Sequence, residues 1–242
     1  MYFRESLRRE GILNIFTDAS QVDGTNIVSP GYIAVTTQNN EDVIVDKRAI
    51  VLENSTNNNG EIRAISLALH YAALYKGRYE YINLFADSLL CINTLREWIY
   101  SWMKMPKYDS ETKEKILLTG SGTPVANQSE IIGCLRTIIM NNLNVCLYHI
   151  KGHVTSTEAS LNNALKVFIK SNYFSPDSIS IDDIVYLCTY NNAIDEYTTS
   201  TLELYNPRTI PLEKVLHNSV YSGINLKKYA ELTNNKILKK GE

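Results

Sequence analysis

The chain has 242 residues, of which 44% are hydrophobic, so it can bury one full core and a small second one. We expect a cytoplasmic protein, because no run approaches the roughly 20 apolar residues of a membrane span and the start lacks a signal peptide's apolar stretch. Its 24 basic and 26 acidic residues give a net charge of −2, which argues against a protein that coats nucleic acid through nonspecific electrostatic binding. Four cysteines without zinc-motif spacing are interpreted as reduced core residues: Cys91, Cys134, Cys146 and Cys188.

The chain begins with β-prone runs and then alternates between helical and β-prone segments. Strands are expected at 12–17, 31–37, 43–52, 81–86 and 144–150. Helices are expected at 61–75, 89–103, 127–143 and 157–171. Residues 105–124 are predicted to form an irregular excursion. This order favours an α/β fold with a five-stranded mixed sheet flanked by helices.

A distinct segment follows the turn-like residues at 175–177. We therefore divide the chain into a catalytic domain, 1–172, and a C-terminal extension, 173–242. Helices are expected in the extension at 181–191, 211–220 and 225–240. This segment could form a small helical domain, a surface for an unknown protein partner, or a cover for the sheet.

Three carboxylates fall at the ends of the predicted elements. Asp18 ends the first strand, Glu61 lies in the first turn of a helix, and Asp87 follows the strand at 81–86. Each alone is an ordinary turn or helix-start residue. Together they indicate a site, because ligands of α/β sheets usually bind beyond the strand ends. Converging carboxylates require a cation, and oxygen ligands without cysteine favour Mg²⁺ or Mn²⁺ over zinc.

The residues around these carboxylates resemble the motifs of type 1 ribonucleases H. Residues 15–20 are similar to the family's Thr-Asp-Gly-Ser segment, with Ala19 in place of glycine, and residues 56–61 are similar to its Thr-Asn-Asn-x-x-Glu. The other segments that carry the resemblance are 85–88, Trp98 with Trp102, 124–127, and the Ile-Lys-Gly-His at 150–153. The resemblance spans residues 12–171 and rests on the order of these motifs.

The resemblance implies a ribonuclease H-like fold and hydrolysis of the RNA strand of RNA–DNA hybrids, which leaves 3′-hydroxyl and 5′-phosphate ends. It also implies a two-metal-ion mechanism with two Mg²⁺, for which Mn²⁺ can substitute. Asp18, Glu61, Asp87 and the residue at position 163 would be the catalytic ligands. His153 would assist proton transfer or product departure.

Position 163 departs from the family pattern, because Asn163 stands where type 1 enzymes carry a fourth carboxylate. An amide oxygen supplies no charge, so the affinity for metal should fall. We prefer a natural variant that retains activity; the alternatives are an engineered Asp-to-Asn change and a hybrid-binding module that does not cut. A carboxylate of the extension could substitute, and the candidates are Asp182, Asp183, Asp195 and Glu196.

We expect a monomer, and the resemblance also implies nucleic-acid contacts. Minor-groove contacts, where the 2′-hydroxyl distinguishes RNA from DNA, are expected at Ala19, Ser20, Asn57 and Asn58. Thr56 and Asn127 match positions that hold a DNA-strand phosphate, although asparagine-rich segments are also ordinary turns. Trp98 and Trp102 would contact a deoxyribose or fill the core. A protrusion with Lys104 and Lys107, diluted by acidic residues, would add salt-sensitive affinity. Another nuclease or an integrase with the same fold is the remaining rival.

Overall fold

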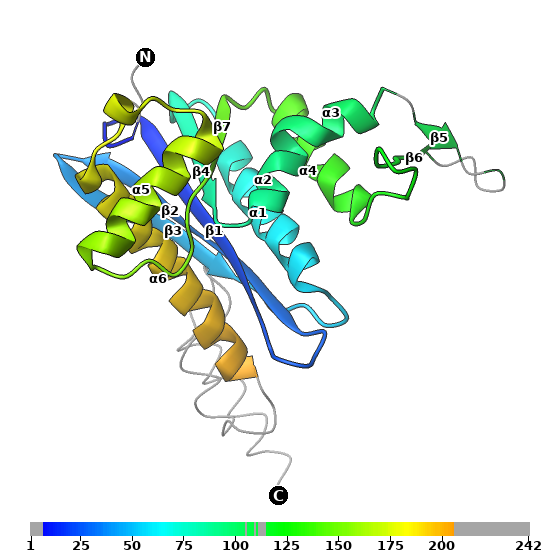
Figure 1. Ribbon diagram of the computed structural model, residues 1–242, viewed down its shortest axis with the longest axis horizontal. Helices are drawn as coiled ribbons and strands as arrows, with labels where there is room; N and C mark the ends of the chain where they lie inside the picture. The colour runs from blue at the N-terminus through cyan, green and yellow to red at the C-terminus, as the bar shows by residue number, and fades with distance from the viewer. Residues whose placement is uncertain (1–6, 105, 109, 111–114, 206–242) are drawn as a thin grey trace, which may run out of the picture.

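The computed structural model describes residues 7–104, 106–108, 110 and 115–205, and its centre is a five-stranded sheet (Figure 1). The strand order is β3-β2-β1-β4-β7. The strands are β1 (Ile12–Gln21), β2 (Val28–Gln38), β3 (Glu41–Ala49), β4 (Tyr81–Ala86) and β7 (Val145–His149). The first three are antiparallel, and β4 and β7 run parallel to β1. The predicted mixed sheet is confirmed.

Helices cover both faces of this sheet (Figure 1). One face carries α1 (Asn57–Leu74), α2 (Leu89–Asn93), η2 (Thr94–Trp98), α3 (Ile99–Trp102) and α4 (Gln128–Met140). The opposite face carries α5 (Glu158–Asn172), η3 (Pro176–Ser178) and α6 (Ile181–Tyr205). A small two-stranded sheet, β5 (Lys107–Tyr108) with β6 (Lys115–Ile116), lies in the predicted excursion. None of the helices in the described part of the chain has the length and apolar character that a membrane span requires.

The central strand β1 contributes to a separate hydrophobic core on each face, because successive side chains of a strand point in opposite directions. Leu13 and Ile15 belong to the core beneath α1 and α4. Phe16 belongs to the core beneath α5 and α6, where its ring stacks on Phe85 with centroids 4.9 Å apart. A strand covered on both faces is apolar along most of its length.

Helix α6 is the described part of the C-terminal extension, and it packs along the sheet as a cover. Ile184, Leu187 and Ile194 are buried in the same core as Phe16. The contact is close, since a Cβ added to Gly31 of β2 would lie 2.8 Å from Thr198 Cγ2. The described part of 173–242 therefore shares a core with the preceding domain.

Helix α6 is also longer than predicted, because it continues from the expected end at 191 to Tyr205. Residues 192–205 include three threonines and two tyrosines, which have modest helix propensity, so the pattern there did not strongly favour a helix. Packing against the sheet stabilises this half of the helix instead. The helices expected at 211–220 and 225–240 lie outside the described residues.

Two predicted boundaries near the carboxylates are wrong. β1 does not stop at Asp18, because residues 18–21 continue to pair with β2, and Asp18 lies opposite Gly31. Glu61 is not in the first helical turn, because α1 begins at Asn57, where the Thr56 hydroxyl accepts a hydrogen bond from the Asn59 amide at 3.3 Å. Strand pairing and helix capping extended both elements through residues whose polarity suggested a break.

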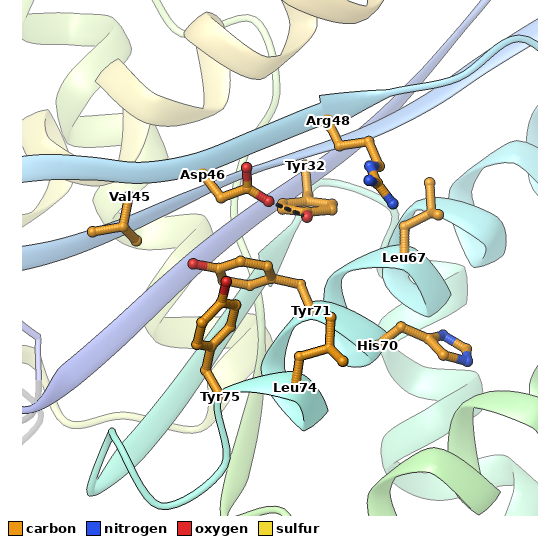
Figure 2. Close-up of a pocket in the computed structure, with 9 residues that line it drawn as sticks. All are labelled: Tyr32, Val45, Asp46, Arg48, Leu67, His70, Tyr71, Leu74 and Tyr75. Atoms are coloured by element: carbon orange, nitrogen blue, oxygen red, sulfur yellow. Dashed lines mark hydrogen bonds between the residues drawn. The ribbon is translucent and has the colours of Figure 1, made fainter. Parts of the chain in front are cut away.

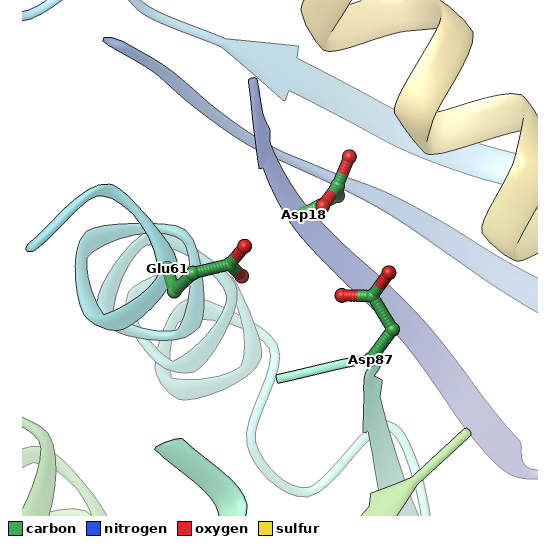
Figure 3. Close-up of side chains that lie close together, drawn as sticks. All are labelled: Asp18, Glu61 and Asp87. Carbon is green, nitrogen blue, oxygen red and sulfur yellow. The ribbon is translucent and has the colours of Figure 1, made fainter. Parts of the chain in front are cut away.

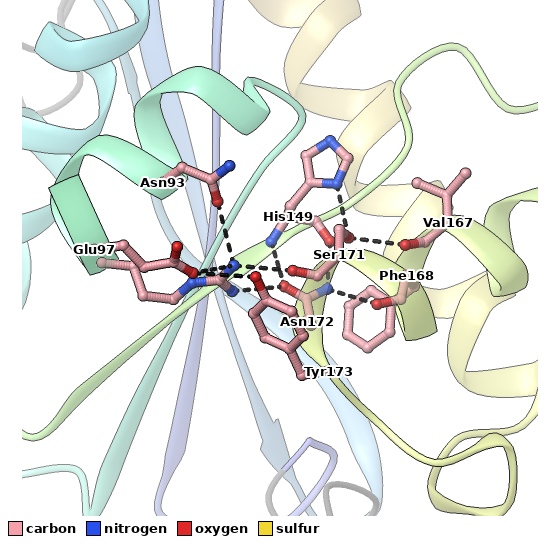
Figure 4. Close-up of polar contacts among 9 residues, drawn as sticks. Asn93, Glu97, His149, Val167, Phe168, Ser171, Asn172 and Tyr173 are labelled. Atoms are coloured by element: carbon pink, nitrogen blue, oxygen red, sulfur yellow. Dashed lines mark hydrogen bonds and ion pairs between the residues drawn. The ribbon is translucent and has the colours of Figure 1, made fainter. Parts of the chain in front are cut away.

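A polar network at the end of β7 links α5 to β7 and to Arg96 of η2 (Figure 4). Asn172 donates to the His149 carbonyl at 2.7 Å and accepts from the His149 amide at 2.9 Å. The guanidinium of Arg96 donates to the Ser171 carbonyl at 2.9 Å. His149 Nε2 lies 3.1 Å from the carbonyl oxygen of Asp87. The network thus holds the backbone at the start of the Asp87 loop.

Candidate active site

The three predicted carboxylates converge at the point where β4 ends and β1 continues. The last residues paired between these strands are Thr17 and Ala86. Asp18 and Asp87 come next on the two parallel strands, so their side chains lie next to each other. Glu61 reaches the same point from α1 (Figure 3). One oxygen from each carboxylate lies within 4.8 Å of the others.

The start of α1 is held against β1 by a contact between two small residues. A Cβ added to Gly60 would lie 2.9 Å from the Ala19 Cβ, so a larger residue at position 60 would push the helix away. Ala19 is the residue that departs from the family's glycine, and the absent side chain of Gly60 leaves room for its methyl group. This contact positions Glu61, the next residue of the helix.

The electrostatics of the three carboxylates favour a cation. Burial and repulsion by Asp87 raise the pKa of Asp18 to about 7. Burial raises the pKa of Glu61 well above its usual range, and repulsion by the two aspartates adds to this effect. Burial also raises the pKa of Asp87. Each carboxylate in this cluster is therefore hard to ionise without a compensating positive charge.

Two further observations show that the residues fit a hard divalent cation. Glu61 Oε2 is buried and has no hydrogen-bond partner, which is costly unless another group satisfies this oxygen. A Cβ added to Gly152 would lie 2.2 Å from Asp87 Oδ2, so the loop leaves this carboxylate only the room it needs. The donors are all oxygen atoms, which suits Mg²⁺ or Mn²⁺.

His153 and Asn163, the other two predicted catalytic residues, have different surroundings from the three clustered carboxylates. His153 has a positive φ of 52°, and its exposed ring lies with Nδ1 3.4 Å from Asp195 Oδ2. Its charge lowers the pKa of Asp87, although burial outweighs this effect. Asn163 lies on α5 and is exposed to solvent, whereas Asp18 and Glu61 are buried.

Helix α6 brings polar groups to the carboxylates that the motifs did not indicate. The Thr198 hydroxyl lies 3.3 Å from Asp18 Oδ2, and the Asn191 amide hydrogen-bonds to Asp87. Asp195 repels both Asp18 and Asp87 electrostatically. Sequence reasoning named Asp195 only as one of four tail carboxylates. The spacing of 191, 195 and 198 on one helix face was the available signal, and it is weak in a polar segment.

The other tail carboxylates named from the sequence have different surroundings. Asp183 accepts hydrogen bonds from the backbone amide and the hydroxyl of Ser180, so it serves the start of α6. Asp182 lines a separate pocket with Arg8 and Asp42. Glu196 is exposed.

Several predicted nucleic-acid contacts gather beside the start of α1. Thr56 and Asn127 line one pocket together with Asn59 and Arg63. Asn59 Nδ2 donates to Asn127 Oδ1 at 3.1 Å, which links the two segments. The other lining residues are Leu52, Glu53, Asn54, Ser55 and Glu130. Asn57 and Asn58 are exposed at the first turn of the helix.

The remaining predicted contacts are more dispersed. The Ser20 hydroxyl lies 2.8 Å from that of Thr198, so its side chain contacts α6. Trp98 is partly exposed, whereas Trp102 packs against the core, and their ring centroids are 6.1 Å apart. Lys104 and Lys107 are exposed.

A further pocket lies between α1 and the strands β2 and β3 (Figure 2). Tyr32 donates a hydrogen bond to Asp46 Oδ2 at 2.5 Å, and its ring lies against that of Tyr71. Burial raises the pKa of both tyrosines. The residues that line this pocket are Tyr32, Val45, Asp46, Arg48, Leu67, His70, Tyr71, Leu74 and Tyr75. It contains none of the three clustered carboxylates.

Comparison with known proteins gave one family match and several similar folds. The family model described as RNase H matches residues 10–165. The RNase H1 of Halobacterium salinarum is 16% identical over 67% of this chain and 98% of its own, with a TM-score of 0.39. The PFV RNase H domain is 18% identical over 69% and 96%, with a TM-score of 0.46. LC9-RNase H1, a type 1 RNase H with the type 2 active-site motif, is 16% identical over 67% and 74%, with a TM-score of 0.45. A search of curated proteins found no match.

Proposed function

The chain belongs to the RNase H family, and from this premise we propose that it cuts the RNA strand of RNA–DNA hybrids, leaving 3′-hydroxyl and 5′-phosphate ends. The observation that carries the proposal is the convergence of Asp18, Glu61 and Asp87 within 4.8 Å. Their order and spacing match the family's catalytic motifs. Their burial and mutual repulsion support a site that functions with bound cations.

Asp18, Glu61 and Asp87 would hold two divalent ions, Mg²⁺ or Mn²⁺. When bound, such a pair supplies activation of a water molecule and stabilisation of the leaving oxygen in a phosphodiester displacement. Asp18, on the central strand β1, would contribute its carboxylate to holding the ions together with Glu61 and Asp87. The exposed ring of His153 would transfer protons between the site and solvent, because its Nδ1 already lies beside a carboxylate.

The pocket at the start of α1 supports the substrate assignment. Thr56 and Asn127 offer a hydroxyl and an amide at this pocket, where the Arg63 guanidinium is paired with Glu130 at 2.7 Å. These groups suit a phosphate of the DNA strand. Asn57 and Asn58 are exposed nearby, where they can reach the minor groove and its 2′-hydroxyl groups.

The direct test is incubation of the purified chain with an end-labelled RNA–DNA hybrid and Mg²⁺ or Mn²⁺. We expect cleavage of the RNA strand only, 5′-phosphate products, and no cleavage with a chelator present. Asp18→Asn should lower the rate by about 10³-fold or more, because it removes a charge at the reacting centre. Asp23→Asn is the matched control, since Asp23 is exposed in the turn after β1.

The alternative is a hybrid-binding module that does not cut, which the uncharged Asn163 favours. Gel-shift titration of the same hybrid separates the two functions. Tight binding without RNA cleavage in either metal would establish the alternative. Equal cleavage of duplex DNA would instead indicate another nuclease of the same fold.

A further inference from the structure

The carboxylate cluster is approached by helices from both faces of the sheet. β4 ends at Ala86, whereas β1 continues to Gln21, so β1 has no β4 neighbour from Asp18 onward. Glu61 reaches this gap from α1 (Figure 3), and α6 packs on β1 and β2 at the opposite face of the sheet (Figure 1). The position where the family carries its fourth carboxylate is the exposed, uncharged Asn163. An oxygen donor from α6 would therefore replace the missing fourth carboxylate.

Three residues on one face of α6 are directed at this gap. Asn191, Asp195 and Thr198 are spaced four and three positions apart, which places them on the same side of a helix. The Thr198 hydroxyl lies 3.3 Å from Asp18 Oδ2, and the Asn191 amide hydrogen-bonds to Asp87. Asp195 Oδ2 lies 3.4 Å from His153 Nδ1, the ring that the family motif places at the site.

Unsatisfied oxygens on both sides of the gap point to a bound cation. Asn191 Oδ1 is buried without a hydrogen-bond partner, and its residue is only 2% exposed. Glu61 Oε2 is buried and unpartnered on the α1 side. Buried oxygen acceptors of this kind normally have a donor or a metal ion as partner. The two atoms come from helices on opposite faces, and both belong to residues at the same carboxylate cluster.

We propose that α6 completes the metal centre, with Asp195 as its fourth carboxylate and Asn191 as a neutral oxygen donor. This inference rests on the proposed function, because it concerns the same site. Asp195 lies beside the ring of His153, and its charge repels those of Asp18 and Asp87. Its side chain is 36% exposed, so a cation and its water molecules can reach it.

The docking of α6 is rigid enough to position these donors. The buried amide of Asn14 donates to the Tyr186 hydroxyl at 2.9 Å. Tyr190 stacks on Phe16 with centroids 5.3 Å apart, one residue before Asn191. Beyond Asp195, Thr198 packs closely on Gly31. The donors thus lie between fixed contacts rather than on a loose end of the chain.

The experiment is isothermal titration of the full chain with Mn²⁺, which reports metal binding independently of cleavage. We expect Asp195→Asn to weaken the binding by about 10-fold or more, because a charged ligand is lost. Glu196→Gln removes the same charge from the next, exposed residue and should leave the affinity within about twofold. Asn163→Ala should also have little effect. Equal affinities of Asp195→Asn and Glu196→Gln would overturn the proposal, as would a larger loss in Asn163→Ala.

Thermal unfolding in a chelator distinguishes ligation from a structural ion pair. We expect Asp195→Asn to keep or raise the Tm of the metal-free protein, because it relieves repulsion with Asp18 and Asp87. A lower Tm together with unchanged Mn²⁺ affinity would assign Asp195 to an ion pair with His153 and overturn the proposal. Asp18→Asn separates the two claims. If it does not reduce Mn²⁺ binding, the proposed function fails; if it does and Asp195→Asn does not, only this inference fails.

Discussion

Helices α1 and α6 approach Asp18 from opposite faces of the sheet, but only α1 carries a sequence motif that indicated its role at the site. α1 carries Glu61 in a motif whose residues cap the helix and pack it on β1. α6 carries Asn191, Asp195 and Thr198 in a polar segment without a motif. A local motif thus reveals a side chain whose position depends on nearby residues. A side chain brought in by a separate helix leaves no such pattern.

The largest expected effects test whether both helices belong to one folding unit. Ile65 of α1 and Ile194 of α6 are both fully buried. We expect Ile65→Ala and Ile194→Ala each to lower the free energy of unfolding by about 2–5 kcal/mol, because each leaves a cavity. Urea denaturation followed by circular dichroism measures this. Val185→Ala, on the exposed side of α6, should cost less than about 0.5 kcal/mol.

A main transition that Ile65→Ala weakens and Ile194→Ala leaves unchanged would show that α6 folds separately. The two helices would then belong to two separate domains.

The loop after β7, which contains Gly152, also contacts the site, and a substitution there is the next test. Gly152→Ala would place a Cβ 2.2 Å from Asp87 Oδ2, so this carboxylate would have to leave its present position. We expect hybrid cleavage to fall by about 10- to 100-fold, because small displacements of reacting groups are costly. Gly133→Ala is the control: nothing lies within 4 Å of its added Cβ in α4, and it should leave cleavage unchanged. A fully active Gly152→Ala would contradict the placement of Asp87.

The repulsion between Asp18 and the neighbouring carboxylates can be measured through the pH dependence of the free energy of unfolding. The folded pKa of Asp18 is raised from 3.8 to about 7, so the folded protein retains a proton that the unfolded chain has lost between these values. Stability from this group is present below pH 3.8 and is lost as the pH rises through 7. In a chelator, Asp18→Asn should therefore gain on the parent by about 1–3 kcal/mol between pH 4 and 8.

The measurement is urea denaturation of both proteins across this range, with Asp23→Asn as a reference that should show no such trend. A constant difference between Asp18→Asn and the parent would argue against the raised pKa. Saturating Mn²⁺ should reverse the order at pH 8, because the cation stabilises the ionised parent.

The smallest expected effect concerns the contact between α6 and Asp18. Thr198→Val keeps the shape of the side chain and removes the hydroxyl that lies near Asp18 and Ser20. We expect a loss of about 1 kcal/mol in the free energy of unfolding, the usual contribution of one hydrogen bond, and a few-fold lower cleavage rate. Thr189→Val, on the exposed side of α6, should alter stability less and leave cleavage unchanged. Equal effects of the two variants would mean that the contact does not matter.

The fold class and the convergence of three carboxylates could be predicted from the sequence. Alternating apolar runs predicted the five strands, and Asp18, Glu61 and Asp87 stood in recognisable local motifs. The exact ends of β1 and α1 did not follow, because strand pairing with Gly31 and capping by Thr56 extended them through polar residues.

The groups that face the site from the side opposite α1 depend on tertiary packing. The sequence offered four tail carboxylates with equal weight, and the packing of α6 on β1 and β2 brought Asp195 to His153 while Asp183 remained at the helix start. The buried amide of Asn14, which fixes Tyr186, was likewise hidden within an apolar run. The physical reason is the same in both cases: these contacts join residues more than 40 positions apart, and their energy comes from the fit between elements rather than from either segment alone.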